Sequence, residues 1–301
     1  MGPRRGHNDG MKLAAISKVI RGSLVSWFEG GASSTGAAIA FYTLFSIAPI
    51  LLFVIWIASA FISPDAVQAR MLAQMQLLLG DTGAAAVRSL LVSTRYAGKN
   101  GWSTAAGVLT LLIGATSVFA ELQNALNRIW RTPQEGKRGL WRAARERLLS
   151  FGLVLGVGFL LLVSLIITAA LEGIGNWLGS VIVNWHTVLT IFDLIVGFSV
   201  TTVLFALIFK YIPRETVVWG DVWIGALVTA ALFTIGKILI VVYLGRAAVA
   251  SPYGAAGSFL VLMLWVYYSA QIFLLGAEFT HCYAYQHGSR MGRSEAGTAG
   301  N

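Results

Sequence analysis

The spacing of apolar residues constrains this chain of 301 residues more than any other feature. A helix that crosses a lipid bilayer needs about 20 mostly apolar residues, because the hydrocarbon core is about 30 Å thick and an α-helix rises about 1.5 Å per residue. Six runs of about this length occur, at residues 37–63, 102–120, 148–171, 187–209, 222–244 and 257–280. The sequence therefore predicts an all-α, polytopic membrane protein with six transmembrane helices.

The composition leaves little sequence for anything outside the membrane. Hydrophobic residues make up 56% of the chain and charged residues 12%, whereas about 25% of residues are charged in ordinary soluble domains. We therefore expect one membrane domain, residues 37–280, and no soluble catalytic domain. The chain lacks the H-E-x-x-H, G-x-S-x-G, Walker A and G-x-G-x-x-G motifs, and its single cysteine is Cys282. We expect neither an enzyme nor a bound metal or cofactor.

The positions of Lys and Arg indicate the orientation. Residues 1–36 carry five, residues 121–147 carry seven, and the connection 210–221 and the tail after 280 carry two each, against five on the opposite side of the predicted membrane. Because Lys and Arg collect on the cytoplasmic side, we expect both termini in the cytoplasm. This distribution accounts for the net charge of +9 without a nucleic-acid partner. The basic N-terminus has no continuous apolar core, so we expect no removable signal peptide.

The two ends of the chain are predicted to differ. In the cytoplasmic N-terminal segment, residues 1–36, apolar side chains recur every three or four residues within 11–29, which predicts an amphipathic helix: Leu13, Ile16, Ile20, Leu24 and Trp27. This helix either lies flat on an anionic inner leaflet or packs on the cytoplasmic ends of the spans. For the cytoplasmic tail, residues 281–301, we expect disorder.

Residues 64–101 are too polar to cross a membrane. Val67, Met71, Met75 and Leu78 form one helical stripe, and a second helical stretch follows the glycine-containing turn at residues 80–83. We therefore expect an extracytoplasmic helical hairpin between the first two spans. The hairpin is either a packed connector or a cover that moves over a cavity.

Two ionisable residues lie inside predicted spans, where charge is costly. Asp193 and Lys237 lie six and seven residues from the outer ends of the fourth and fifth runs, which places both about 10 Å below the outer boundary. A short loop joins these spans, so we predict that the two residues form an intramembrane charge pair. The pair is either a structural link between two helices or part of a path for a solute, a lipid or protons.

A second polar group gathers at the cytoplasmic ends of the second and sixth spans. Glu121, Asn124 and Arg128 fall on one face of a helix. Glu278 lies at a similar depth on the sixth span, and Gln271 lies two turns higher. We predict a cytoplasmic vestibule lined by these residues, and a helix-end network is an equally compatible interpretation.

Pro49 falls midway along the first span. Proline removes a backbone donor, so we predict a helix kink there, with Ser46 as a local hydrogen-bonding partner for the freed backbone. A kink of this kind either exposes backbone to a substrate or is simply packed.

Three strings occur together in this order: Ala40-Phe-Tyr-Thr-Leu-Phe-Ser-Ile-Ala-Pro49; Glu121-Leu-Gln-Asn-Ala-Leu-Asn-Arg-Ile-Trp130; and Ser251-Pro-Tyr-Gly-Ala-Ala-Gly-Ser-Phe259, which continues through Leu264-Trp-Val-Tyr-Tyr-Ser-Ala-Gln271 to Gly276-Ala-Glu-Phe-Thr280. In this combination the sequence resembles the YihY/virulence factor BrkB family of bacterial inner-membrane proteins over about residues 20–285. The resemblance implies six membrane helices and a place in the bacterial cytoplasmic membrane. It supplies no catalytic residues.

Members of that family were once labelled ribonuclease BN, and some have been linked to serum resistance or to transport of lipid-like molecules. A metal-dependent nuclease needs clustered His and Asp ligands, which this sequence does not show, so we disfavour ribonuclease activity. We expect a transporter or exporter of a lipid-like or amphipathic solute. The alternative is a non-transporting membrane scaffold or envelope-assembly component. The expected partners are membrane lipids and an unidentified solute, and a homo-oligomer is compatible with the sequence.

Overall fold

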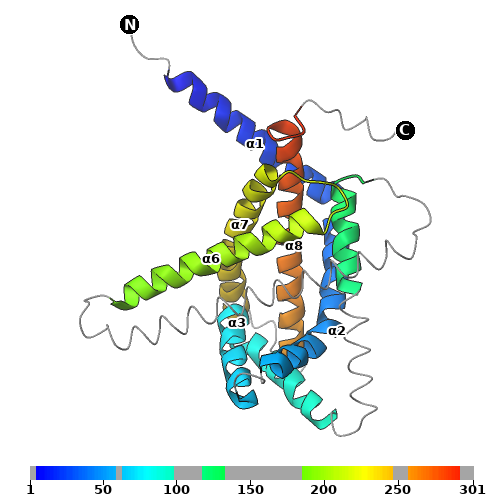
Figure 1. Ribbon diagram of the computed structural model, residues 1–301, viewed down its shortest axis with the longest axis vertical. Coiled ribbons are helices and arrows are strands. Elements are labelled where there is room, and N and C mark those ends of the chain that lie inside the picture. The colour runs from blue at the N-terminus through cyan, green and yellow to red at the C-terminus, as the bar shows by residue number, and fades with distance from the viewer. Residues whose placement is uncertain (1–4, 59–62, 98–116, 133–184, 247–256, 292–301) are drawn as a thin grey trace, which may run out of the picture. The chain divides into compact units, whose positions relative to one another are not determined.

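The computed structural model describes residues 5–58, 63–97, 117–132, 185–246 and 257–291, and these residues form helices without any strand. Figure 1 shows their arrangement along the chain. A further helical stretch covers residues 117–129. The labelled helices are α1 (Arg5–Glu29), α2 (Ala32–Ala58), α3 (Pro64–Ala97), α6 (Trp185–Tyr211), α7 (Trp219–Arg246) and α8 (Gly257–Gln286).

Three of the described helices are long and apolar enough to cross a membrane. The qualifying segments are Leu194–Tyr211 in α6, Trp219–Ile240 in α7 and Phe259–Gln286 in α8, and a shorter apolar segment covers Ala32–Ile47 in α2. The predicted run at 148–171 lies outside the described residues, as does nearly all of the run at 102–120. The described residues therefore include three candidate membrane-spanning helices, and the count of six stays a prediction.

The chain divides into two compact units. Unit 1 comprises Met1–Trp27, Leu126–Thr234 and Leu275–Asn301, and unit 2 comprises Phe28–Ala125 and Ile235–Leu274. Helices α1, α7 and α8 each contribute residues to both units.

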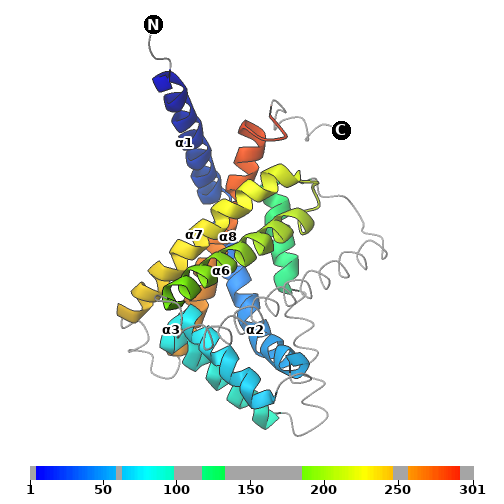
Figure 2. The same cartoon turned by 60° about the vertical axis from the view of Figure 1, so that its left-hand side comes forward.

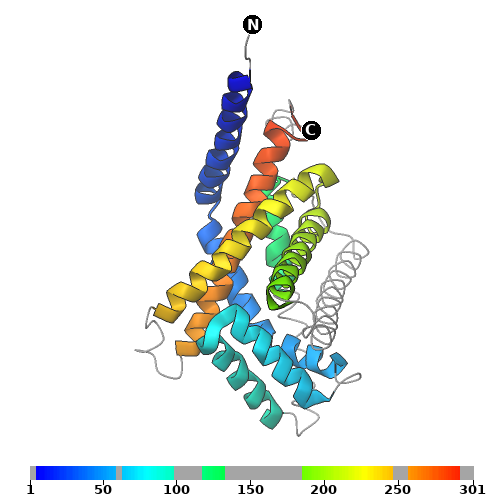
Figure 3. The ribbon, with the colours of Figure 1, turned by 90° about the vertical axis from the view of Figure 1, so that its left-hand side faces the viewer.

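Unit 2 has an apolar core built by α2, α3 and the N-terminal part of α8. Val67 and Met71 from the first half of α3 meet Val87 and Leu91 from its second half in this core, together with Leu262 of α8. The residues predicted to form a turn, 80–83, are themselves helical, because α3 is continuous from Pro64 to Ala97. The ribbon nevertheless changes direction sharply part-way along, so that its two halves lie beside one another (Figures 2 and 3). Both halves thereby reach one core without an intervening coil.

A glycine separates α1 from α2. Gly31 has a φ of 67°, a left-handed conformation that only glycine adopts at little steric cost and that commonly ends helices. Helix α2 then begins at Ala32, five residues before the predicted span boundary. The apolar pattern did not show this, because Ser33, Ser34 and Thr35 look like a linker in the sequence although they form the first turn of the helix.

Helix α2 continues through Pro49 to Ala58. The Ser46 hydroxyl donates to the carbonyl of Tyr42 at 2.8 Å, and a serine bonded one turn back in this way often bends a helix. This carbonyl is not the one that Pro49 leaves free, which belongs to Phe45. Figure 1 shows that the C-terminal part of α2 turns away from its N-terminal part. The assignment of this bend to Pro49 stays a prediction.

Glycine and threonine bring α7 and α8 close together in unit 1. A Cβ atom on Gly225 would collide with Thr280, and one on Gly276 would collide with Thr229. Each threonine hydroxyl donates to the carbonyl four residues before it, Thr229 to Gly225 at 2.6 Å and Thr280 to Gly276 at 2.7 Å. Small residues permit this approach in membrane helices, where packing rather than water drives association.

Residues 281–291 are more ordered than predicted. Helix α8 extends to Gln286, beyond the expected boundary at 280, and residues 287–291 follow as turns. His287 and Gly288 both donate their backbone N–H to the carbonyl of Tyr283 at 2.9 Å. Disorder is therefore the wrong prediction for residues 281–291, because polar contacts within unit 1 hold them. Residues 292–301 lie outside the described part of the chain.

Candidate functional site

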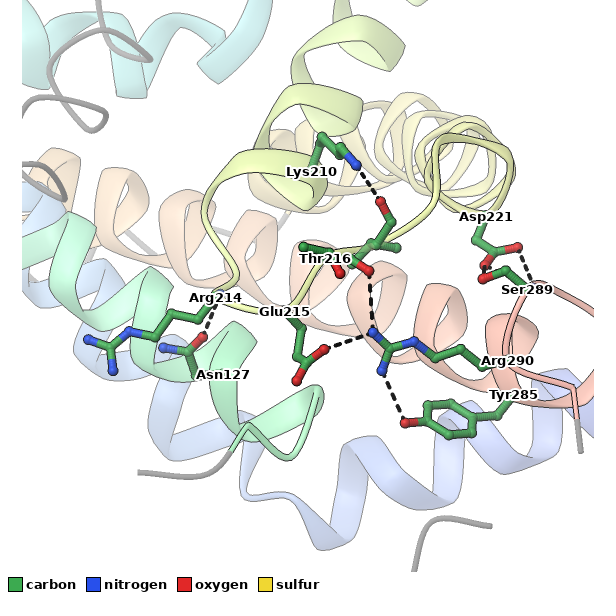
Figure 4. A network of polar contacts seen from close by, with 10 residues as sticks. Asn127, Lys210, Arg214, Glu215, Thr216, Asp221, Tyr285, Ser289 and Arg290 are labelled. Atoms are coloured by element: carbon green, nitrogen blue, oxygen red, sulfur yellow. Dashed lines mark hydrogen bonds and ion pairs between the residues drawn. The ribbon is translucent and has the colours of Figure 1, made fainter. Parts of the chain in front are cut away.

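Arg290 is the centre of a polar cluster in unit 1 (Figure 4). Its Nη2 atom donates to Glu215 at 2.8 Å and to the carbonyl of Thr216 at 3.3 Å, and its Nη1 atom donates to the Tyr285 hydroxyl at 3.2 Å. The guanidinium also lies over the ring of Trp130, 5.3 Å from its centroid. Partial burial disfavours the charged form, but the hydrogen bonds to Glu215 and Tyr285 outweigh it and raise the pKa of Arg290 above its ordinary value.

Asp221 binds Ser289, the residue before Arg290. This aspartate lies in the first turn of α7 and is only 4% exposed. Its carboxylate accepts the Ser289 hydroxyl at 2.6 Å and the Ser289 backbone N–H at 3.2 Å. A buried carboxylate needs such donors, because an unpartnered charge away from water is strongly destabilising. The start of α7 and the residues after α8 are therefore joined. We call Trp130, Glu215, Asp221, Tyr285, Ser289 and Arg290 the tail cluster.

Two further bonds order the connection between α6 and α7. The ammonium group of Lys210 donates a hydrogen bond to the carbonyl of Val217 at 2.6 Å. The Nζ atom of Lys210 also lies 5.5 Å from the centroid of the Trp219 ring. The backbone N–H of Arg214 donates to the side-chain oxygen of Asn127 at 3.0 Å. The connection is thus held at both of its ends by side chains of neighbouring helices.

The helix that carries Asn127 ends in a regular capping motif. Arg131 has a φ of 49°. Its N–H donates to the carbonyl of Arg128, and the N–H of Thr132 donates to the carbonyl of Asn127. This is the bonding pattern of a Schellman motif. The motif places Trp130, 3% exposed, against the His281 ring with centroids 5.3 Å apart.

Exposed aromatic side chains lie at the end of α6 and in the first turns of α7. The rings of Tyr211 and Trp219 meet edge to face, and the ring centroids of Trp219 and Trp223 are 6.3 Å apart. All three are at least 40% exposed. Tyr and Trp collect at the boundary between hydrocarbon and headgroups, where their apolar rings and polar atoms are both satisfied. Together with Lys210, they have the composition expected at a membrane–water interface.

The predicted charge pair divides between the units. Asp193 lies on α6 in unit 1, and its side chain lies outside the described residues. Lys237 lies on α7 in unit 2 and is half-buried, although its neighbours Ile235, Ile238 and Leu239 are exposed. The Lys237 side chain therefore does not lie on the most exposed face of α7. The pairing itself stays a prediction.

The predicted vestibule residues are likewise shared between the units. In unit 2, Glu121 is half-buried and Asn124 exposed, and Gln271 donates its amide to the carbonyl of Ala32 at 3.2 Å. In unit 1, Arg128 is exposed and Glu278 is 8% exposed. Gln271 thus links α8 to the start of α2 within unit 2. A vestibule formed by all five stays a prediction.

Sequence reasoning missed the tail cluster. Arg290 and Ser289 lie in the segment for which we expected disorder, and Asp221 and Glu215 lie in a short connection that gave no motif. The available signal was the number of ionisable residues in that connection, residues 210–221, which holds Lys210, Arg214, Glu215 and Asp221. Positive and negative residues in so short a segment favour ion pairs, although the segment alone does not indicate which residue binds to which.

A family model described as virulence factor BrkB matches residues 27–298. The chain belongs to the virulence factor BrkB family. The match covers the three described candidate spans and the whole tail cluster, and it begins near the end of α1. No solved structure matches the chain.

Curated relatives of this BrkB-family chain are named UPF0761 membrane proteins. The protein of Albidiferax ferrireducens is 31% identical over 61% of this chain and 42% of its own length, and that of Aeromonas salmonicida is 32% identical over 60% of each chain. The protein of Alteromonas mediterranea is 26% identical over 84% of this chain and 83% of its own. The chain spans less than half the length of the first relatives that it matches. The relatives' names establish a membrane protein and describe no activity.

Proposed function

We propose that this chain crosses the bacterial cytoplasmic membrane six times and that both termini lie in the cytoplasm. The three spans that the structure describes, the bacterial membrane proteins among its relatives and the concentration of Lys and Arg near the termini support this topology. The exposed aromatic side chains beside Lys210 then lie at the cytoplasmic headgroup level.

We propose further that the protein is a transporter or exporter of a lipid-like or amphipathic solute and not an enzyme. The observation that carries this proposal is an acidic side chain buried inside an apolar helix. Glu278 is 8% exposed and lies within Phe259–Gln286, the longest apolar segment among the described residues. Ionisable groups in membrane helices are rare because they are costly, and they commonly mark the paths of substrates or ions. The half-buried Lys237 on α7 is a second such group.

Lipid scrambling by the purified protein in liposomes tests the proposal. Fluorescent phospholipid in the inner leaflet becomes accessible to a membrane-impermeant reductant only if the protein moves lipid. We expect faster access with the wild type than in protein-free liposomes, and slower access with Glu278→Gln and Lys237→Met. Arg88→Gln removes an exposed charge on α3 and is the matched control. Access equal to that of protein-free liposomes, for phospholipid and for amphipathic dyes alike, would refute transport.

A non-transporting scaffold is the second candidate, and the tail cluster favours it. Arg290 bonds to Glu215 in the connection before α7, and Ser289 bonds to Asp221 at the start of α7. Short, charge-assisted bonds of this kind suit a fixed joint rather than a moving one. A scaffold predicts that variants of Glu278 and Lys237 change stability while liposome flux stays at background.

The predicted pair of Asp193 and Lys237 has a separate test. Asp193→Asn or Lys237→Met alone leaves the other charge without its partner in the membrane, whereas the double substitution leaves none. We therefore expect the double variant to be more stable in detergent than the less stable single variant. Two harmless single substitutions would contradict the pairing.

A further inference from the structure

One face of α1 is packed within unit 1. Val19 and Ser23 are each 2% exposed, and the Ser23 hydroxyl donates to the carbonyl of Val19 at 2.8 Å. A Cβ atom on Gly22 would lie in contact with Cys282 and Gln286 near the end of α8. This face of α1 therefore meets α8, and the helix is not a free arm over this stretch.

The other face of α1 exposes apolar side chains beside cations. Ile20, Leu24 and Val25 are 47%, 40% and 45% exposed, and Lys18 and Arg21 are exposed as well. Because successive residues of an α-helix turn by about 100°, these five residues share the arc opposite Val19 and Ser23. Exposed aliphatic side chains in water are destabilising when they gather in this way, so the face indicates an apolar partner with negative charge at its edge.

The chain connection limits what that partner is. Only Gly30 and Gly31 separate α1 from the apolar helix α2. Under the membrane topology proposed above, the C-terminal turns of α1 therefore lie close to the level at which α2 enters the bilayer. A second copy of the same face would bring Lys18 and Arg21 near their own equivalents, and like charges repel. An anionic lipid surface satisfies the aliphatic side chains and the cations together.

We propose that the exposed face of α1 binds the anionic phospholipids of the leaflet on its own side of the membrane. Ile20, Leu24 and Val25 enter the boundary between headgroups and acyl chains, while Lys18 and Arg21 contact lipid phosphates. Because the opposite face packs on the end of α8, α1 holds that end of α8 at the headgroup layer. The transport proposal is not needed for this binding, only the membrane topology.

A fluorescent probe at Leu24 tests the proposal in the full-length protein. Leu24→Cys, in a Cys282→Ala background, is labelled with an environment-sensitive dye and reconstituted into bilayers of phosphatidylcholine alone or mixed with phosphatidylglycerol. We expect blue-shifted emission and strong quenching by lipids that carry a shallow nitroxide. Ser26→Cys is the matched control, because Ser26 lies on the same helix but about 160° around its axis from Leu24, on the side of Val19 and Ser23. Ile20→Cys provides a second probe position on the proposed face.

The charge dependence separates anionic lipid from lipid in general. Each cation near an anionic surface strengthens binding about fivefold at low salt. Lys18→Gln combined with Arg21→Gln should therefore lower the quenching in the phosphatidylglycerol mixture to the level in phosphatidylcholine. Quenching at Leu24 and Ile20 no stronger than at Ser26 would overturn the proposal, and so would quenching that is the same in both lipids. Probe shielding that disappears when the protein is diluted in lipid would overturn it too, in favour of a second copy of the chain.

Discussion

The bond between Arg290 and Glu215 gives the sharpest test of the tail cluster. The side chains of Arg290 and Glu215 are 14% and 29% exposed, and the distance from Nη2 of Arg290 to Oε2 of Glu215 is 2.8 Å. Solvent therefore screens this ion pair less than an ordinary surface pair. A hydrogen bond between charged groups contributes about 1.5 to 3 kcal/mol, and partial exposure reduces this. We expect a coupling free energy of about 1 to 2 kcal/mol. Arg290→Met should cost more than Glu215→Gln, because it also removes the contacts with Tyr285 and Trp130.

A double-mutant cycle measures this coupling. Arg290→Met, Glu215→Gln and the double variant are unfolded in mixed detergent micelles, and the change is followed by the fluorescence of the ten tryptophans. Arg88→Met is the control for loss of an exposed arginine far from the cluster in sequence. Additivity of the two single variants to within about 0.5 kcal/mol would refute an energetic link between Arg290 and Glu215.

The pH dependence of this coupling has a definite sign. The pKa of Arg290 is raised in the folded protein, so the stability that this shift contributes is present below the ordinary arginine pKa and is lost only as pH rises through the raised value. Both values lie far above neutrality. The contribution of Arg290 should therefore be the same at about pH 7 and about pH 9, and a loss within that window would contradict the assignment.

Two further predictions concern unit 1. Gly225→Ala should destabilise the protein by about 1 to 3 kcal/mol, because the added Cβ atom would collide with Thr280. A Cβ atom on Gly197 of α6 would meet nothing within 4 Å, so Gly197→Ala should not destabilise. Equal effects of the two substitutions on thermal unfolding in detergent would refute the close packing of α7 on α8. Asp221→Ala should cost about 1 to 3 kcal/mol, since it leaves the hydroxyl and the N–H of Ser289 without their acceptor. Ser289→Ala keeps the backbone bond and should cost less, and the reverse order would contradict this account.

Local pattern predicted the helices well where one rule dominates. The apolar runs at 187–209, 222–244 and 257–280 correspond to α6, α7 and α8, because a span of lipid thickness needs a continuous apolar helix. The boundaries were less accurate. Helix α2 starts earlier than predicted because Gly31, not the change in hydropathy, ends α1. Helix α3 passes through residues 80–83 because glycine and aspartate can remain helical when both halves of the helix pack on one core.

The candidate sites were harder to predict, for a physical reason. Asp193, Lys237 and Glu278 stand out in the sequence because charge contrasts with an apolar background, and each lies on a helix in the structure. Their partners are not encoded in any local spacing. Arg290 lies 75 residues from Glu215, and no periodicity joins residues that far apart.

The sequence alone therefore determined that this chain is helical, that it belongs in a membrane and where its scarce ionic residues lie along each helix. These properties follow from hydropathy and from the requirement that backbone groups in lipid bond within their own helix. Only the tertiary structure decided that the residues after α8 fold back onto Asp221 and Glu215, that Thr229 and Thr280 face glycines, and which side of α1 stays exposed. Those outcomes depend on contacts between distant segments, where packing and the pairing of buried charge outweigh local preference.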